Sequence, residues 1–132
     1  MIQSFGYDTH LHNLFLFKIA YDRTMAGNKV KVDYTNGENG NLWIGGGEGL
    51  LLIKALSESR SFPITAEEVS NLANFRHALL CFFDGDSKIQ IYTISVDNII
   101  SICKNWKIKD PSEVKWITPE DYFQFKRDHF TM

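Results

Sequence analysis

Four polar residues near the middle of the chain have the types that metal-dependent phosphate chemistry uses. Asn41 opens the stretch NLWIGGGEGLLLIK and Lys54 closes it, while Asp33 and Glu48 lie nearby in the sequence. Carboxylate oxygens are preferred ligands of Mg²⁺, and a bound Mg²⁺ polarises a phosphate and activates a water. These four residues are therefore candidates for a catalytic site.

A pair of histidines offers a second candidate chemistry. His10 and His12 have the i, i+2 spacing that places two imidazoles on one face of a strand, where they can share a Zn²⁺. The remaining histidines, His77 and His129, come without supporting carboxylate motifs. A lone pair of this kind specifies little. We interpret both as surface residues near the start of a helix, and we predict no metal site.

Two glycine-rich stretches look like ligand loops but lack the residues that such loops need. Residues 45–49 (GGGEG) have no Gly-Lys-Ser/Thr to form a phosphate-binding loop. A tight turn between two strands explains them better, because glycine tolerates positive φ. Residues 84–87 (DGDS) lack the other ligands of a calcium loop. They indicate a hairpin turn.

The elements that must position these residues can be predicted from hydrophobic patterning and turn signals. A helix is predicted over 12–25, ending at Ala26-Gly27. Strands follow, and the strand at 50–56 is apolar enough to be central and buried on both faces. The complete set of predicted strands is 29–34, 41–44, 50–56, 77–83 and 88–95.

Three helix starts are marked by capping residues. Thr65 and Glu68 have the spacing of a capping box. Ser95 or Asp97 starts the next helix, and Thr118-Pro119 starts a C-terminal one. The predicted order is α-β-β-β-α-β-β-α-α, a mixed α/β fold around one sheet.

The C-terminal helix is expected to carry an aromatic face. Tyr122, Phe125 and His129 fall at helical i, i+3, i+7 spacing, which is typical of side chains that face a core. The alternative is a protein-binding surface, including a homodimer interface, to which Trp106 and Trp116 would contribute.

The stretch from Asn41 to Lys54 resembles the core of the restriction-endonuclease-like (PD-(D/E)xK) superfamily, in particular the archaeal Holliday-junction resolvases. There, an Asp opens a short strand, a Gly-rich turn follows, and the next strand carries Glu-x-Lys. The matching positions here are Asn41, Leu52 and Lys54. SFPITAEEVSNLANF and HALLCFFDGDSKIQIYTISVDNI match the following helix and the last two strands. The resemblance covers residues 12–105 and implies a mixed sheet flanked by helices, in a single domain of residues 1–132 with a helical extension over 106–132.

The resemblance also implies a degenerate site. Neutral Asn41 and apolar Leu52 stand where the superfamily has two carboxylates that hold Mg²⁺. Lys54 is left as a remnant of the lysine that, by the resemblance, would orient the attacking water or stabilise the developing charge. The superfamily tends to place a further Glu on its first helix, and the region near His12 has none. We therefore expect no cofactor and lean against catalysis. The alternative is a Mg²⁺-dependent nuclease whose relocated ligands, Asp33 and Glu48, act beside Lys54.

Composition limits the classes of partner and compartment. With 132 residues, 44% of them hydrophobic, the chain suits one domain. Its 14 basic and 16 acidic residues lack the basic excess of a dedicated DNA binder. No apolar run is long enough for a membrane span, and no signal peptide is recognisable. Cys81 and Cys103 lie in apolar contexts, as buried thiols do in a reducing, cytoplasmic compartment.

Three functional hypotheses follow. The first is a non-catalytic nuclease-like module that binds nucleic acid or a nucleic-acid-processing partner. DNA would then be bound by Lys29, Lys31, Lys54 and Arg60. The second is a small protein-binding inhibitor or immunity protein. Its acidic face would draw on Glu58, Glu67, Glu68, Asp84, Asp86 and Asp97. The third is the nuclease with relocated ligands described above.

Overall fold

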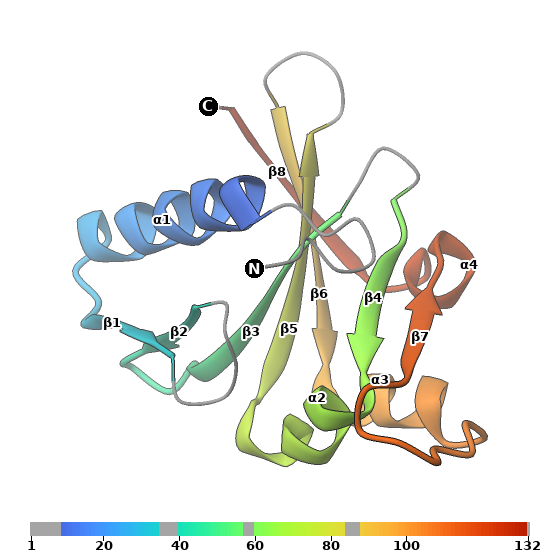
Figure 1. The fold of residues 1–132 in the computed structure, drawn as a ribbon. Helices are drawn as coiled ribbons and strands as arrows, with labels where there is room; N and C mark the ends of the chain where they lie inside the picture. The colour runs from blue at the N-terminus through green and yellow to red at the C-terminus, as the bar shows by residue number, and fades with distance from the viewer. Residues whose placement is uncertain (1–8, 35–39, 57–59, 84–87, 132) are drawn as a thin grey trace.

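The chain forms a mixed α/β fold around one main sheet (Figure 1). The structure is a computed structural model that describes residues 9–34, 40–56, 60–83 and 88–131. Within these residues the main sheet has six strands. In their order across the sheet, they are β1 (Val30–Asp33), β2 (Asn41–Ile44), β3 (Gly49–Ala55), β5 (His77–Phe83), β6 (Lys88–Ser95) and β8 (Lys126–Thr131). Among the described elements, helices are α1 (Thr9–Met25), α2 (Ala66–Asn71), η2 (Leu72–Asn74), α3 (Val96–Cys103) and α4 (Pro119–Tyr122).

The sheet is mixed because one pair of neighbouring strands is parallel and the other pairs are antiparallel. β1, β2 and β3 form an antiparallel meander. The chain then crosses through β4 (Phe62–Thr65) and α2, and β5 pairs with β3 in parallel. β6 pairs antiparallel with β5, and β8 with β6. β3 is therefore an interior strand, as its apolar sequence predicts, and its residues from Leu51 to Ala55 are buried.

Within the part of the chain that the structure describes, α1 is the element that covers one face of the main sheet. Its residues Phe15, Leu16 and Ile19 pack on a layer of side chains that alternate along β2, β3, β5 and β6. These sheet residues are Leu42, Ile44, Leu51, Ile53, Ala55, Leu79, Cys81, Ile89 and Ile91. Figure 1 shows α1 lying across this face, to one side of the remaining elements.

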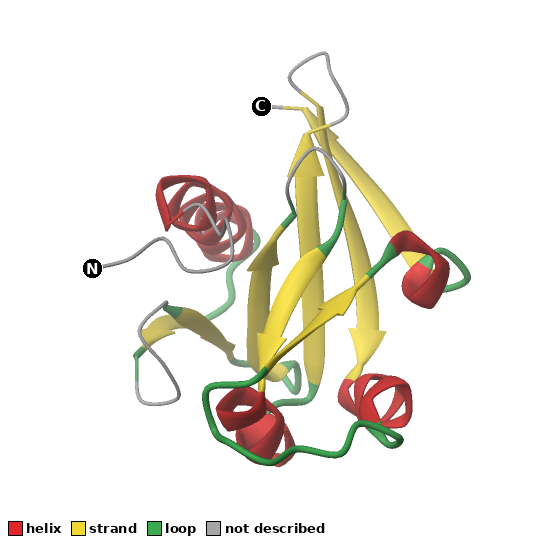
Figure 2. Ribbon diagram, turned by 45° about the vertical axis from the view of Figure 1, so that its right-hand side comes forward, coloured by secondary structure: helices red, strands yellow, loops and turns green. Residues whose placement is uncertain are grey.

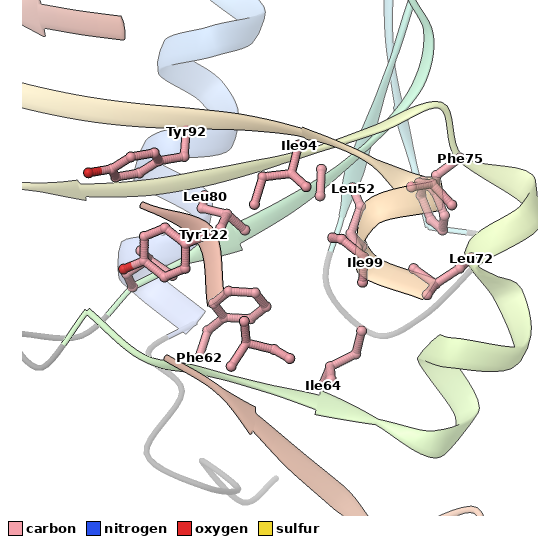
Figure 3. Close-up of a cluster of buried hydrophobic side chains, with 14 of the residues drawn as sticks. Leu52, Phe62, Ile64, Leu72, Phe75, Leu80, Tyr92, Ile94, Ile99 and Tyr122 are labelled. Atoms are coloured by element: carbon pink, nitrogen blue, oxygen red, sulfur yellow. The ribbon is translucent and has the colours of Figure 1, made fainter. Parts of the chain in front are cut away.

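The other face is covered by a second, two-stranded sheet together with short helices. β4 pairs antiparallel with β7 (Val114–Ile117), and this small sheet crosses in front of the main one (Figure 2). The cluster beneath it is built from apolar side chains of both sheets and of the helices at the end of the fold (Figure 3). It includes Leu52, Phe62, Ile64, Leu72, Phe75, Leu80, Tyr92, Ile94, Ile99 and Tyr122.

Most predicted elements are confirmed within the described residues. α1 extends over the predicted helix, and β5 and β6 have the predicted bounds. Thr65 and Glu68 form the predicted capping box, with the Glu68 amide donating to Thr65 Oγ1 at 3.0 Å. Ser95 caps α3. The predicted hairpin turn at 84–87 lies outside the described residues.

The predicted C-terminal helix is wrong beyond its first turn. Thr118 and Asp121 form a capping box and Pro119 occupies the first turn, so the start signal is correct. The helix ends at Tyr122, and residues Lys126–Thr131 form β8 instead. β8 pairs with the outer edge of β6, with Lys126 opposite Thr93. A long sheet edge left unpaired is unfavourable, so a tertiary ladder replaces the local helical pattern.

β4 and β7 were not predicted as a sheet of their own. β4 contains Pro63, which argues against a strand when the sequence is considered alone. Its partner β7 comes about fifty residues later, and Phe62 lies opposite Ile117. The predicted mixed sheet flanked by helices is confirmed, and the small sheet is an addition to its second layer that was not predicted.

The two cysteines lie in apolar surroundings, as the sequence analysis predicts. Cys81 and Cys103 are both buried and free, and burial raises the pKa of each thiol. Among the helices that the structure describes, none combines the length and the apolar character that crossing a membrane requires.

Candidate functional site

Asn41 and Lys54, the two ends of the nuclease-like stretch, lie on neighbouring strands. The last ladder pair between β2 and β3 at this end joins Leu42 and Leu51. Beyond it, the amide oxygen Oδ1 of buried Asn41 accepts a hydrogen bond from the Ile53 N–H at 3.0 Å. The side chain thus takes the place of a backbone acceptor where the ladder ends. Asn41 therefore has a structural contact at the position of the resemblance's metal-binding Asp.

Lys54 is buried, with 5% of its surface exposed, and its charge is paired inside the protein. It alternates with Leu52 and Leu56, so its side chain points toward the small sheet. Its Nζ donates to the Pro63 carbonyl at 3.2 Å and to Glu68 Oε2 at 2.5 Å. A buried ammonium needs such partners, because an unpaired charge is costly to remove from water. Lys54 is thus not a lysine that extends to solvent.

Glu68 connects this ion pair to the start of α2. One carboxylate oxygen accepts from Lys54, and the other accepts from the Thr65 N–H at 3.0 Å. Burial would raise the pKa of Glu68. The positive charge and hydrogen bond of Lys54, with the hydrogen bonds of Thr65, outweigh burial and lower it. Glu68 therefore stays ionised, and its capping role fixes it as the counter-ion of Lys54.

His12 is the third buried polar group in this region. Its Nε2 lies 2.7 Å from the Gly40 carbonyl, which can only accept, so Nε2 carries the proton. Burial lowers the pKa of His12, against the opposing effect of the Gly40 hydrogen bond. The charges of Lys54 and Glu68 also reach the ring, the first lowering and the second raising that pKa. The prediction that His12 lies on the surface is wrong, whereas His10 is exposed.

His12, Asn41, Lys54 and Glu68 together form what we call the polar cluster. The sequence analysis identified Asn41 and Lys54 as site residues but missed His12 and Glu68 in this role. A lysine inside an otherwise apolar strand does signal that an acid must lie nearby. Which acid supplies the charge depends on the crossover from β3 to α2, which no local pattern encodes.

Asp33 and Glu48, the two acids predicted as relocated metal ligands, do not lie beside Lys54 as a metal site would require. Glu48 forms a salt bridge with Arg23 of α1, with Nε and Oε2 2.9 Å apart. Since a strand rises about 3.3 Å per residue, Glu48 and Lys54 lie on the order of 20 Å apart along β3. Asp33 lies in β1, opposite Asn41. Across the described residues, no group of three His, Cys, Asp or Glu side chains could hold a metal ion.

The four predicted DNA-binding residues do not share a surface. Lys29 and Lys31 are exposed at the β1 edge, where Lys31 Nζ lies 5.5 Å from the Trp43 ring centroid. Arg60 precedes β4 and has a positive φ of 60°. Its guanidinium stacks 4.7 Å from the Phe82 ring centroid, and the Tyr122 hydroxyl donates to its carbonyl. Lys54 is buried in the polar cluster.

The predicted acidic face is only partly described. Glu67 and Asp97 are exposed, whereas Glu68 is paired with Lys54 inside the protein. Glu58, Asp84 and Asp86 lie outside the described residues.

The geometry leaves little acid–base or metal chemistry to the polar cluster. The ammonium of Lys54 is already paired, the Asn41 oxygen holds a backbone N–H, and Leu52 belongs to the core. No protein-family model matches this chain, and neither a curated protein nor a solved structure shows significant similarity to it.

Proposed function

We propose that this chain is a non-catalytic, nuclease-like module of the cytoplasm that works by binding a protein partner. The observation that carries the proposal is the Lys54–Glu68 ion pair, in which Lys54 is 5% exposed. A lysine that stabilises a phosphoryl transition state must meet the substrate. Lys54 instead meets a glutamate and the Pro63 carbonyl.

The arrangement of elements supports the restriction-endonuclease-like part of the proposal. A helix precedes three antiparallel strands, and a crossover containing a helix leads to a parallel strand with an antiparallel hairpin partner. The polar cluster occupies the ends of β2 and β3 where the resemblance expects its site. In this interpretation, Asn41 and the Lys54–Glu68 pair are structural replacements for a metal centre.

A protein partner is favoured over DNA because of the distribution of positive charge. Phosphate binding depends on several cations that act on one surface. Lys54 is buried, and Arg60 lies over Phe82 on the side of the small sheet, whereas Lys29 and Lys31 lie at the β1 edge. An inhibitor or immunity protein is one form that the proposed function could take.

The test is a titration of the purified protein against duplex and four-way-junction DNA at low salt, with Mg²⁺ and then with Mn²⁺. We expect neither cleavage nor salt-sensitive binding. The matched variant is Lys54→Met, which removes the ammonium and keeps an unbranched side chain of similar length. Cleavage by the unmodified protein that Lys54→Met abolishes would show an active nuclease and overturn the proposal.

Nucleic-acid binding stays as a second candidate function because Lys29 and Lys31 are both exposed at one sheet edge. Salt-sensitive binding without cleavage would support it. Such binding should then weaken in Lys29→Glu/Lys31→Glu. The control, Lys107→Glu/Lys109→Glu, makes the same charge change at two exposed lysines between α3 and β7.

A further inference from the structure

α1 carries large apolar side chains on the face that points away from the sheet. Phe15, Leu16 and Ile19 of this helix are buried, whereas four other large apolar side chains are exposed to solvent. Their exposed fractions are 40% for Leu14, 54% for Phe17, 60% for Tyr21 and 69% for Met25. We call these four residues the outer stripe. Figures 1 and 2 show that no other described element covers this side of α1.

The outer stripe is continuous along the helix. Its spacing is i, i+3, i+7, i+11, which aligns side chains on one face of a helix. At about 100° per residue, this face lies opposite the one that packs on the sheet. α1 therefore has two apolar faces, with polar residues such as Lys18 and Asp22 between them. An apolar face of a helix is normally buried. One of these two faces is exposed, and an exposed apolar patch of this kind marks an interaction site.

We propose that the outer stripe is a homodimer interface, in which α1 of one copy packs antiparallel on α1 of a second copy. The order of side chains in the stripe is self-complementary under a two-fold rotation near its midpoint. Antiparallel pairing places Leu14 of each copy opposite Met25 of the other. Likewise, Phe17 comes opposite Tyr21. The midpoints of the two pairs differ by half a residue, about 0.8 Å along the helix, so one axis can serve both pairs, as an isologous interface requires.

Charge complementarity agrees with this pairing. Lys18 and Asp22 border the outer stripe and form an i, i+4 ion pair 3.0 Å apart, with side chains 25% and 27% exposed. Antiparallel packing brings Lys18 of one copy next to Asp22 of the other. Each pair then contributes to a four-charge network across the axis. A parallel arrangement would instead bring like charges together, which is destabilising.

The interface is built mainly from one helix of each copy, so it falls at the small end of specific interfaces. We expect a reversible dimer with a dissociation constant on the order of 10 µM. Sedimentation equilibrium of the full chain from about 1 to 300 µM covers both the monomer and the dimer in that case. A monomer at every concentration would overturn the proposal. A different protein would then be the candidate partner of the outer stripe.

The first variants place a carboxylate in the centre of the stripe. Phe17→Glu and Tyr21→Glu should each weaken the association at least tenfold, because two charges would be desolvated near the axis. The control is Ile108→Glu, at an exposed apolar residue (42% exposed) between α3 and β7. Urea unfolding at low protein concentration verifies that each variant is folded. A dimer that persists unchanged in Phe17→Glu would contradict the interface.

A mixing experiment tests the antiparallel geometry. The double variant Lys18→Asp/Asp22→Lys exchanges the two charges and keeps an ion pair within the chain. Its own antiparallel dimer again has opposite charges across the axis. Mixed with the unmodified chain, it puts like charges across an antiparallel axis but opposite charges across a parallel one. We expect the two homodimers to be at least tenfold favoured over the heterodimer, measured with one chain fluorescently labelled. Statistical mixing or an excess of heterodimer would overturn the antiparallel arrangement.

Discussion

The two faces of the main sheet are covered in different ways. On one face, α1 packs its buried side chains on the sheet and leaves Phe17 and Tyr21 exposed on its outer side. On the other face, the small sheet, α3 and α4 close a cluster that includes Phe62 and Tyr122, both almost fully buried. Among the described residues, the first layer is a single helix that is apolar on both of its sides. The second layer is built from several elements, and Trp116 and Phe123 at its surface are also exposed. The proposed dimer would cover the outer side of α1.

The charged side chains on the two faces of the sheet also differ in how exposed they are. The face of the small sheet contains the Lys54–Glu68 pair, which is neutralised within the chain. The outer side of α1 carries Lys18 and Asp22, which remain partly accessible. A buried charge without a partner is strongly destabilising, whereas accessible charges influence the choice of partner and its orientation.

The largest expected difference between the two sides of α1 comes from truncating two phenylalanines. Phe15→Ala should lower the free energy of unfolding by about 3–5 kcal/mol, because it leaves a cavity beneath the helix. Phe17→Ala should change it by no more than about 0.5 kcal/mol, since its side chain is exposed. Urea unfolding of the dilute protein measures both. Similar losses would mean that the outer side of α1 is packed within one chain.

Breaking the buried ion pair on the other face should have the next largest effect. Glu68→Gln leaves the Lys54 ammonium without a counter-ion and should cost about 3 kcal/mol. Lys54→Met removes the buried charge and should cost clearly less, because Glu68 retains its bonds to Thr65 and some access to water. The measurement is again urea unfolding. Lys54→Met/Glu68→Gln should be more stable than Glu68→Gln, and equal stabilities would contradict the coupling of these two residues.

Two tyrosines allow the two faces to be compared by removing a single hydroxyl from each. Tyr122 is fully buried and donates to the Arg60 carbonyl, so Tyr122→Phe should cost about 1–2 kcal/mol. Tyr21 belongs to the exposed stripe, and Tyr21→Phe should be neutral to within about 0.5 kcal/mol in the dilute protein. Thermal unfolding can rank the two variants. A larger loss in Tyr21→Phe would reverse the assignment of inner and outer faces.

The smallest effect concerns the pH dependence of stability at the edge of the α1 layer. Because burial lowers the pKa of His12 from its ordinary value of 6.5 in the folded protein, the unfolded chain binds a proton more readily. The stabilisation is complete above pH 6.5 and is lost as the pH falls through the lowered pKa. His12→Gln should flatten this acidic limb in urea unfolding at a series of pH values. The control, His10→Gln, removes an exposed imidazole and leaves the Gly40 contact intact.

The outcome of the C-terminal prediction shows how far local signals reach. Thr118 and Pro119 mark a helix start correctly, because capping depends on residues a few positions apart. The helical spacing of Tyr122 and Phe125 is equally local, yet the helix ends at Tyr122 and a strand follows. The edge of β6 decides this, and its position depends on the rest of the fold.

In the candidate site, too, some residues could be predicted from the sequence and others could not. Asn41 and Lys54 could be selected from the sequence, because they stand at the positions that the resemblance to the restriction-endonuclease-like stretch indicates. Their partners could not be selected. The Ile53 N–H, Glu68 and the Gly40 carbonyl meet these side chains and His12 only after the meander, the crossover and α1 have assembled.

The sequence by itself determined the elements whose causes are short-range. Apolar periodicity set α1 and the interior strand β3, and capping residues set the starts of α2, α3 and α4. Tertiary structure alone decided which charges neutralise each other, which edge recruits β8, and which side of α1 faces the sheet. The physical reason is that burial is a property of the assembled layers: Phe15 and Phe17 are chemically identical, and only packing makes one core and the other surface.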